Sequence, residues 1–189
     1  MPVVVFDFDK TLTYKDTLYG FYCSVSGKSP LHPLTLSYLV YPVLHRCRRV
    51  SNDSLKRAGI ALFLAGMSRQ ALITKARAYA STITLNRIYR EIFTRTTRPV
   101  VVSASFEALL TCLFAPPVTV LGSTLRYNSR DEVAGLDQNC HGPQKVSRLN
   151  AIGITSIDKL YTDSFSDAPL MRISKEVYLV TGDACCSIH

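Results

Sequence analysis

Short apolar runs of strand length, rich in β-branched residues, alternate with helix-length segments along much of the chain, and this alternation limits the possible folds most strongly. Strands that alternate with helices form a parallel sheet, and helices cover both of its faces. Since 47% of the 189 residues are hydrophobic, the chain can bury such a core. We therefore predict an α/β fold. The expected strands are residues 3–6, 100–102, 118–121, 159–162 and 177–180, and the expected helices are 106–114, 143–151 and 167–174.

A further group of helices is expected between the first two strands. Ser51 or Asp53 can begin one helix, Gly66 can end it, and Ser68 can begin the next. Because the chain leaves the sheet after the first strand and returns for the second, these helices should lie over the carboxyl end of the sheet, where open α/β sheets bind ligands. The predicted division is a core of residues 1–12 and 99–189 with a hairpin at 125–136, and a helical cap of residues 13–98.

The charge is divided in the same way as the predicted elements. Residues 13–98 hold 14 of the 22 Lys and Arg residues but only 3 of the 14 acidic residues, so this segment carries +11 and the remainder −3. Such a basic segment favours an anionic partner. It can steer a small phosphorylated substrate, dock on an anionic membrane, or contact nucleic acid. We expect no nucleic acid partner, because no recognised binding motif accompanies the basic residues.

Two carboxylates follow the first predicted strand, in the sequence Asp7-Phe8-Asp9-Lys10-Thr11. Strand alternation places Asp7 and Asp9 on the same side as the chain leaves the sheet. Carboxylates this close repel each other unless a cation or a shared proton relieves them. Mg²⁺ suits oxygen ligands and a phosphate substrate. Helix capping would explain either Asp alone, but not both directly after a buried strand.

Four motifs in order along the chain resemble those of the haloacid dehalogenase-like hydrolase superfamily. They are the DFDKTLT segment at residues 7–13, VVSAS at 101–105, NCHGPQK at 139–145 and YTDSFSDAP at 161–169. The position of the cap between the first two motifs is similar to that in the phosphoserine-phosphatase-like branch. The resemblance implies a Rossmann-like parallel sheet with an inserted helical cap. It also implies a phosphatase that acts through an aspartyl-phosphate.

The resemblance implies a role for each matching residue. Asp7 would be the nucleophile, Asp9 the acid and base, and Lys145 the bridge between the nucleophile and the phosphate. The phosphate would be held by Ser103, Ala104, Thr11 and Lys145. The cofactor Mg²⁺ would be bound by Asp7, Asp9 and Asp163, with Asp167 in support.

Taken alone, the later motifs have simpler structural explanations. Ser105 can cap the helix that begins at Phe106, Lys145 can be a solvated surface residue, and Ser166 or Asp167 can cap the last helix. Outside enzymes, the alternative is a phosphate-binding protein that has lost its activity. The complete set of motif residues favours the enzyme.

The substrate is less constrained than the chemistry. Phosphoserine phosphatases resemble this sequence around Asp16, but at that position they carry a Glu that recognises the amine of the substrate. A phosphoserine-like metabolite is therefore one expected substrate. Asp16 or Thr17 can instead cap the first helix of the cap. The SAS and TDS sequences at residues 103–105 and 162–164 depart from the forms common in phosphoserine phosphatases.

A lipid phosphate is the alternative substrate. Residues 29–44 carry no formal charge, and Arg46, Arg48 and Arg49 follow them. Basic residues beside an apolar segment can hold a protein on an anionic membrane, and some members of the branch resemble phosphatidylglycerophosphate phosphatases. The run, which includes Leu34 and Leu39, can equally form the inside of the helical bundle.

The cellular compartment is predicted from the cysteines and the first residues. Six cysteines without a CxxC pair favour a reducing environment, and residues 1–6 contain no basic segment typical of a signal peptide. We expect a cytoplasmic protein, which would contact the inner face of a membrane if the cap docks there.

Overall fold

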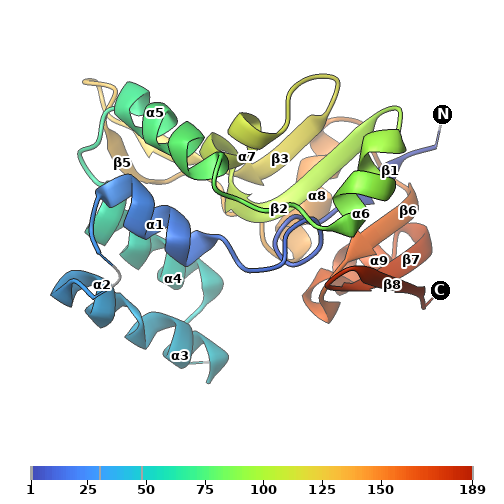
Figure 1. Cartoon of the computed structure of the whole chain (residues 1–189), viewed down its shortest axis with the longest axis horizontal. Helices are drawn as coiled ribbons and strands as arrows, with labels where there is room; N and C mark the ends of the chain where they lie inside the picture. Colours follow the sequence, from blue (N-terminus) through green and yellow to red (C-terminus); the bar gives the residue numbers. More distant parts are fainter. Residues whose placement is uncertain (1, 30, 48, 189) are drawn as a thin grey trace.

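The core of the molecule is a six-stranded sheet (Figure 1). The structure is a computed structural model that describes residues 2–29, 31–47 and 49–188. The strand order is β3-β2-β1-β6-β7-β8. All neighbouring pairs are parallel except β7 and β8, which are antiparallel. The predicted parallel sheet is therefore confirmed. The strands are β1 (Val4–Phe6), β2 (Pro99–Phe106), β3 (Thr119–Ser123), β6 (Ile157–Thr162), β7 (Ser174–Thr181) and β8 (Ala184–Ser187).

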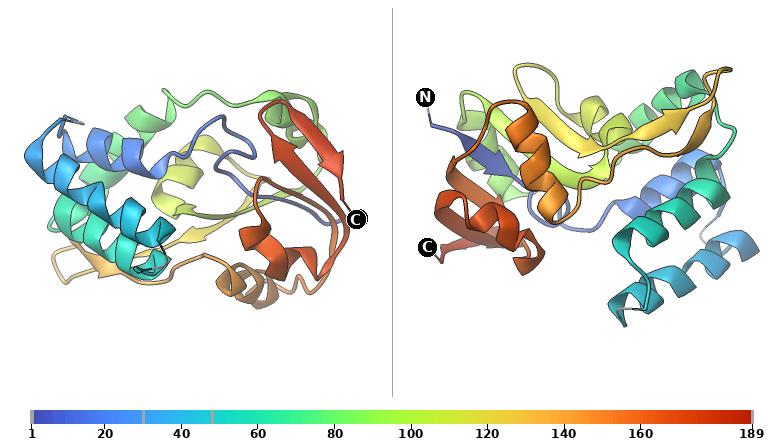
Figure 2. Two further views of the ribbon diagram at one scale, coloured as in Figure 1. Left: turned by 90° about the horizontal axis from the view of Figure 1, so that it is seen from below. Right: turned by 180° about the vertical axis from the view of Figure 1, so that it is seen from behind.

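Side chains alternate between the two faces of the sheet, and a separate buried cluster covers each face. Phe6 and Val101 belong to the cluster that includes α7 (Glu107–Leu113). Val5 and Val102 belong to the opposite cluster, together with residues of α8 (Pro143–Ala151) and α9 (Ala168–Met171). The view from behind shows α8 on that second face (Figure 2). Helices thus cover both faces, as the sequence predicts.

The chain between β1 and β2 forms helices, as predicted. Ser51 and Ser68 are N-caps, and each side chain accepts a hydrogen bond from the backbone N–H three residues later. Gly66 has a φ of +78°, which favours glycine after a helix. The helices are α1 (Leu18–Ser26), α2 (Pro33–Tyr38), α3 (Val40–Arg46), α4 (Asn52–Gly59), α5 (Arg69–Ala80) and α6 (Arg87–Glu91), with a π-helical turn at Ile60–Leu64 and a 3-10 turn at Phe93–Arg95.

These inserted helices pack at two places on the sheet. Figure 1 shows α1 to α4 gathered at one end of the molecule, whereas α6 lies near β1. Tyr22 of α1 stacks on Phe63 and contacts the ring of Phe106 in β2, with centroids 5.2 and 6.0 Å apart. Next to α6, the ring of Phe93 lies 5.1 Å from that of Phe6 in β1. The division into a core and a cap at residues 13 and 98 stays a prediction.

Two predictions near the edges of the sheet have different outcomes. The hairpin is confirmed: β4 (Leu125–Tyr127) and β5 (Val133–Leu136) form a separate antiparallel pair. The helix expected at 167–174 is too long, because α9 ends at Met171 and Ser174 already pairs with Ile157 of β6. The helix therefore ends before Ser174, because this residue belongs to β7 and pairs with β6. The strand β8 was not predicted.

The apolar run at residues 29–44 is neither wholly buried nor wholly exposed. Thr35 and Tyr38 are buried, whereas several apolar side chains of α2 and α3, and that of Leu39 between them, are exposed. The exposed fractions are 46% for Leu36, 40% for Leu39, 55% for Val40 and 62% for Val43. The predictions for Arg48 and for the side chains of Leu34 and Arg46 lie outside the described residues. In the part of the chain that the structure describes, no helix is long and apolar enough to cross a membrane.

Candidate active site

The predicted site residues gather where β1, β2 and β6 end. These strands are neighbours and parallel, so their carboxyl ends meet. We call the cavity at this edge, with a volume of about 350 Å³, the carboxylate cavity. The described residues that line it are Asp7, Asp9, Lys10, Asp16, Asn52, Ser103, Ala104, His141, Lys145, Asp163, Ser164, Ser166 and Asp167.

Thr11 is the predicted site residue that does not line the carboxylate cavity. It is completely buried, and its carbonyl oxygen accepts a hydrogen bond of 2.8 Å from the Asn86 side chain. The phosphate-binding role expected for Thr11 stays a prediction.

Lys145 is buried between two carboxylates at the start of α8. Its Nζ lies 2.8 Å from Asp7 and 2.8 Å from Asp167, and 4% of its side chain is exposed. Pro143 occupies the first turn of α8, which places Lys145 in the same turn. These two ion pairs raise the pKa of Lys145, so it stays an ammonium group despite its burial. The interpretation of Lys145 as a solvated surface residue is wrong.

Asp7 carries its charge in an unfavourable environment. Burial raises the pKa of Asp7; Lys145 opposes this shift and nearby Asp167 adds to it, so that the pKa lies at about 7. Burial also raises the pKa of Asp163, which lines the same cavity. A cation beside these carboxylates would stabilise their charged forms.

Asp9 is held by two hydrogen bonds from different elements. The backbone N–H of Thr17 donates to Oδ1 at 2.8 Å, and the Ser105 hydroxyl donates to Oδ2 at 2.5 Å. Burial, followed by the nearby charge of Asp16, raises the pKa of Asp9 to about 6. A carboxyl with a pKa near neutrality can give and take a proton at physiological pH.

Ser103 and Ser105 belong to the end of β2 and have different contacts. Ser103 is buried, and its hydroxyl accepts a hydrogen bond of 3.1 Å from the backbone N–H of Ser105. The interpretation of Ser105 as a helix cap is wrong, because its hydroxyl bonds Asp9 and the N-cap of α7 is Phe106. Sequence analysis missed this contact because Asp9 and Ser105 meet only through the parallel pairing of β1 and β2.

Asp167 is buried in the 3-10 turn that follows β6, and its side chain contacts Thr162 and Lys145. It accepts a hydrogen bond of 2.9 Å from Thr162 in addition to its ion pair with Lys145. It stands at the N-cap position of α9, but its side chain makes no capping hydrogen bond. Nor does Ser166 cap α9: in the short 3-10 turn at Phe165–Asp167, its backbone N–H donates to the capping Ser164 side chain. Capping therefore does not explain either residue.

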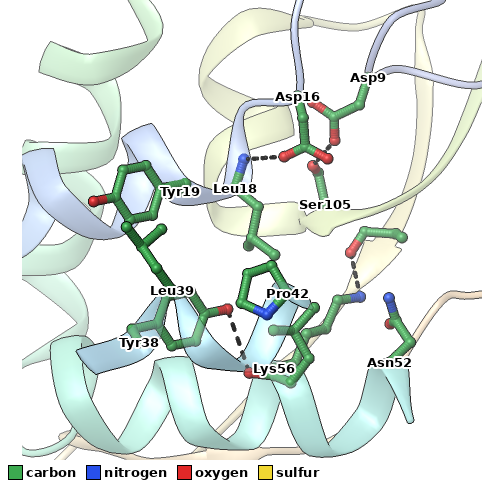
Figure 3. Close-up of a pocket in the computed structure, with 12 residues that line it drawn as sticks. Asp9, Asp16, Leu18, Tyr19, Tyr38, Leu39, Pro42, Asn52, Lys56 and Ser105 are labelled. Atoms are coloured by element: carbon green, nitrogen blue, oxygen red, sulfur yellow. Dashed lines mark hydrogen bonds between the residues drawn. The ribbon is translucent and has the colours of Figure 1, made fainter. Parts of the chain in front are cut away.

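A second cavity adjoins the carboxylate cavity on the side of the inserted helices (Figure 3). We call it the cap cavity; its volume is about 530 Å³. The two cavities share lining residues, including Asp9 and Asp16. The described residues that line the cap cavity are Asp9, Asp16, Leu18, Tyr19, Tyr38, Leu39, Pro42, Asn52, Leu55, Lys56, Ala104 and Ser105.

Asp16 contacts the start of the first inserted helix, and its predicted role in recognising the substrate stays a prediction. Its Oδ1 accepts a hydrogen bond of 3.0 Å from the backbone N–H of Leu18, the first residue of α1 (Figure 3). Asp16 also lines both cavities. This hydrogen bond thus holds a carboxylate at the boundary between the two cavities, one residue before Thr17, the N-cap of α1.

Lys56 of α4 is a buried residue that sequence analysis missed. Its Nζ donates to the Ala104 carbonyl at 2.5 Å, to Ser123 at 2.7 Å and to Asn139 at 2.5 Å. Burial lowers the pKa of Lys56 to about 7. A signal was present, because Lys56 shares a helical spacing with the buried Ile60 and Phe63, which marks the buried face.

The oxygen atoms around Asp7 suit a hard divalent cation. Mg²⁺ prefers oxygen ligands, keeps several waters and needs only one or two carboxylates from the protein. Asp7 and Asp163 line one cavity and have raised pKa values, which is the electrostatic condition that a cation relieves. Within the described residues, no three His, Cys, Asp or Glu side chains form a group that could hold a metal ion by themselves. The donors therefore fit Mg²⁺ better than an ion held by protein side chains alone.

Comparison with known families identifies the class of the chain. The family model for haloacid dehalogenase-like hydrolases matches residues 4–172. Since this match covers most of the chain, the protein belongs to the haloacid dehalogenase-like hydrolases. A sequence comparison with curated proteins finds no match.

Solved structures share the fold at low sequence identity. A phosphoserine phosphohydrolase-like protein from Francisella tularensis is 14% identical, with a TM-score of 0.66 over 94% of this chain and 86% of that one. A phosphoserine phosphatase, described as a phospho-aspartyl intermediate analogue, is 15% identical, with a TM-score of 0.63 over 93% and 84%. An HAD family hydrolase from Salmonella enterica serovar Typhi is 13% identical, with a TM-score of 0.64 over 92% of this chain. The chain spans 61% of that hydrolase.

Proposed function

We propose that the protein is a Mg²⁺-dependent phosphatase that hydrolyses a phosphomonoester of a small metabolite through a phosphorylated Asp7. The observation that carries the proposal is the buried contact of Lys145 with Asp7 and Asp167 at 2.8 Å. A buried ammonium group beside a carboxylate and an open cavity can stabilise the negative charge of an incoming phosphate. Family membership and the fold shared with phosphoserine phosphatases support this chemistry.

Each residue has a defined task in the proposed reaction. Asp7 attacks phosphorus as the bond between phosphorus and the leaving oxygen breaks, and water then displaces Asp7 to release inorganic phosphate, so that one difficult displacement becomes two easier ones. Asp9 gives a proton to the leaving oxygen and then takes one from the attacking water. Lys145, the Ser103 hydroxyl and the backbone N–H of Ala104 bind the phosphate oxygens.

The metal would be held by Asp7, Asp163 and the backbone carbonyl of Asp9, with Asp167 in support. When bound, Mg²⁺ neutralises negative charge on the phosphate. Asp167 has a second task here, because its ion pair keeps the Lys145 ammonium directed at Asp7.

The direct test is phosphate release from p-nitrophenyl phosphate with and without Mg²⁺. We expect Mg²⁺-dependent release by the native protein and a loss of at least about 100-fold in kcat for Asp7→Asn. Asp131→Asn is the matched control, because Asp131 lies in the exposed hairpin turn with a φ of +57°, which Asn also tolerates. Equal activity of Asp7→Asn and the native protein would contradict the proposal.

A lipid phosphate is the second candidate substrate, and the exposed side chains of α2 and α3 favour it. Leu36, Val40 and Val43 are 46 to 62% exposed on adjacent helices. Arg49, which is also exposed, follows α3. Apolar side chains beside basic ones suit the surface of an anionic bilayer.

Sedimentation with vesicles tests this second candidate. We expect the protein to bind vesicles that contain anionic lipid more strongly than neutral vesicles. The Val40→Asp, Val43→Asp double variant should lose this binding and keep its circular dichroism spectrum. If the double variant binds as well as the native protein, α3 does not contact the membrane.

A further inference from the structure

We propose that the cap cavity receives the organic part of the substrate, and that this part is apolar and carries no negative charge. The substrate class is then an alkyl or aryl phosphate. This inference rests on the proposed phosphatase function and names the kind of phosphomonoester that the same site accepts.

Asp9 lies at the boundary between the two cavities, where the leaving oxygen of the substrate would be. The phosphate belongs in the carboxylate cavity, beside Asp7 and Lys145. Asp9, which would protonate the leaving oxygen, lines both cavities. The group attached to that oxygen must therefore leave the carboxylate cavity past Asp9, and the cap cavity opens there.

The far part of the cap cavity is formed by apolar side chains of three inserted helices. Leu18 and Tyr19 come from α1, Leu39 and Pro42 from the α2–α3 region, and Leu55 from α4. Figure 3 shows Leu18 and Pro42 between Asp16 and Lys56, with Leu39 beside them near Tyr19. A cavity of about 530 Å³ with this lining has the size and polarity of sites that bind small organic ligands. Burial of alkyl or aryl carbon is its favourable interaction.

The charged groups of the cap cavity disfavour an acidic substrate. Among its described lining residues, Lys56 is the one cation, and its Nζ already donates to three acceptors within 2.7 Å. Only 1% of Lys56 is exposed, so a carboxylate in the cavity could pair with it only after those bonds break. Asp16 and Asp9 would repel such a group. A carboxylate or a second phosphate on the organic part is therefore unfavourable.

The cap cavity continues to the molecular surface. Leu39 lines the cavity and is 40% exposed, and Pro42 is also exposed. A chain longer than the cavity can therefore extend outward along α2 and α3. The same apolar recognition serves a dissolved alkyl phosphate and a phosphate lipid whose chain leaves a bilayer.

A series of soluble substrates tests the proposal. Methyl, butyl and hexyl phosphate are compared with phosphoserine, each at the same Mg²⁺ concentration. We expect kcat/KM to rise by at least about tenfold from methyl to hexyl phosphate, since each buried CH₂ can contribute up to about fourfold. We also expect phosphoserine to be hydrolysed more slowly than hexyl phosphate. Equal rates along the series, or a preference for phosphoserine, would overturn the proposal and leave the phosphatase function intact.

If the folded protein hydrolyses none of these compounds in the presence of Mg²⁺, both the phosphatase function and the proposed specificity are overturned. The two failures are therefore distinguishable. The readout of phosphate release is the same in every arm.

Two variants test whether the preference for a longer alkyl chain arises in the cap cavity. Leu39→Asp adds a charge to its wall, and we expect the ratio of kcat/KM for hexyl over methyl phosphate to fall at least about tenfold. Ile152→Asp is the matched control, because Ile152 is 47% exposed at the end of α8 and lines neither cavity. An unchanged ratio in Leu39→Asp would overturn the proposal.

A final arm separates the two sources of the apolar phosphate. Soluble octyl phosphate is compared with a dialkyl lipid phosphate in vesicles that contain anionic lipid. A higher kcat/KM for the vesicle substrate, lost in Val43→Asp, identifies a membrane source, and a higher value for octyl phosphate identifies a soluble one. Either result supports the apolar specificity. Hydrolysis of neither compound, with rapid hydrolysis of phosphoserine, overturns it.

Discussion

Buried charges dominate the site at the scale of single residues. Lys145 pairs with two carboxylates, and Lys56 donates to three neutral acceptors. A buried charge costs free energy unless partners compensate for it. The two lysines therefore respond differently to substitution and to pH.

Replacement of Lys145 should destabilise the fold as well as abolish activity. Lys145→Met leaves the buried carboxylates of Asp7 and Asp167 without their cation. We expect the free energy of unfolding to fall by about 3 kcal/mol, measured by urea denaturation without metal at pH 7.5. Adding Asp167→Asn should restore part of this loss, because one carboxylate is removed. A loss below about 1 kcal/mol in the single variant would contradict the assigned ion pairs.

Lys56 should make stability depend on pH. Burial lowers its pKa from 10.5 to about 7, so between these pH values the unfolded chain binds a proton that the folded protein does not. The free energy of unfolding contributed by Lys56 therefore rises with pH in this window, by at most about 1.4 kcal/mol per pH unit. Lys56→Met should lack this rise when both proteins are denatured with urea at pH 7, 8 and 9. The same slope in both proteins would contradict the assignment.

At the scale of elements, local patterns predicted what local interactions decide. The β-branched runs identified β1 and β2, and Pro143 identified the start of α8. The end of α9 was missed because pairing between β6 and β7, which depends on the whole sheet, decides it. Lys56 was missed for a similar reason: its partners lie 48 to 83 residues away in the sequence.

Gly59 at the end of α4 tests how tightly the inserted helices pack. A Cβ on Gly59 would lie 2.4 Å from ring atoms of the buried Tyr22. Helix propensity alone predicts that Gly59→Ala stabilises the protein by about 1 kcal/mol, because its φ of −61° is helical. We expect the opposite sign, a loss of about 1 to 3 kcal/mol in urea denaturation, since Tyr22 must move. A stabilised variant would show that α1 and α4 pack loosely.

At the scale of the whole molecule, the inserted helices and the sheet together line both cavities. Lys56 of α4 bonds the backbone of Ala104, and Ser105 next to it bonds Asp9. The sequence placed the inserted segment over the carboxyl end of the sheet, and both cavities lie at that junction. The sequence alone did not predict the lining of the cap cavity, because the lining residues come from several helices and from β2 and meet only in the folded protein.

Detection of a phosphoryl group on Asp7 tests the central claim most directly. The protein is mixed with Mg²⁺ and an excess of hexyl phosphate, quenched in acid within its first turnover, digested and analysed by mass spectrometry. We predict that the peptide that contains Asp7 gains the mass of one phosphoryl group, and that alkaline treatment removes it. Steady release of phosphate by the protein, with no phosphoryl group on Asp7 and undiminished activity in Asp7→Asn, would contradict the account.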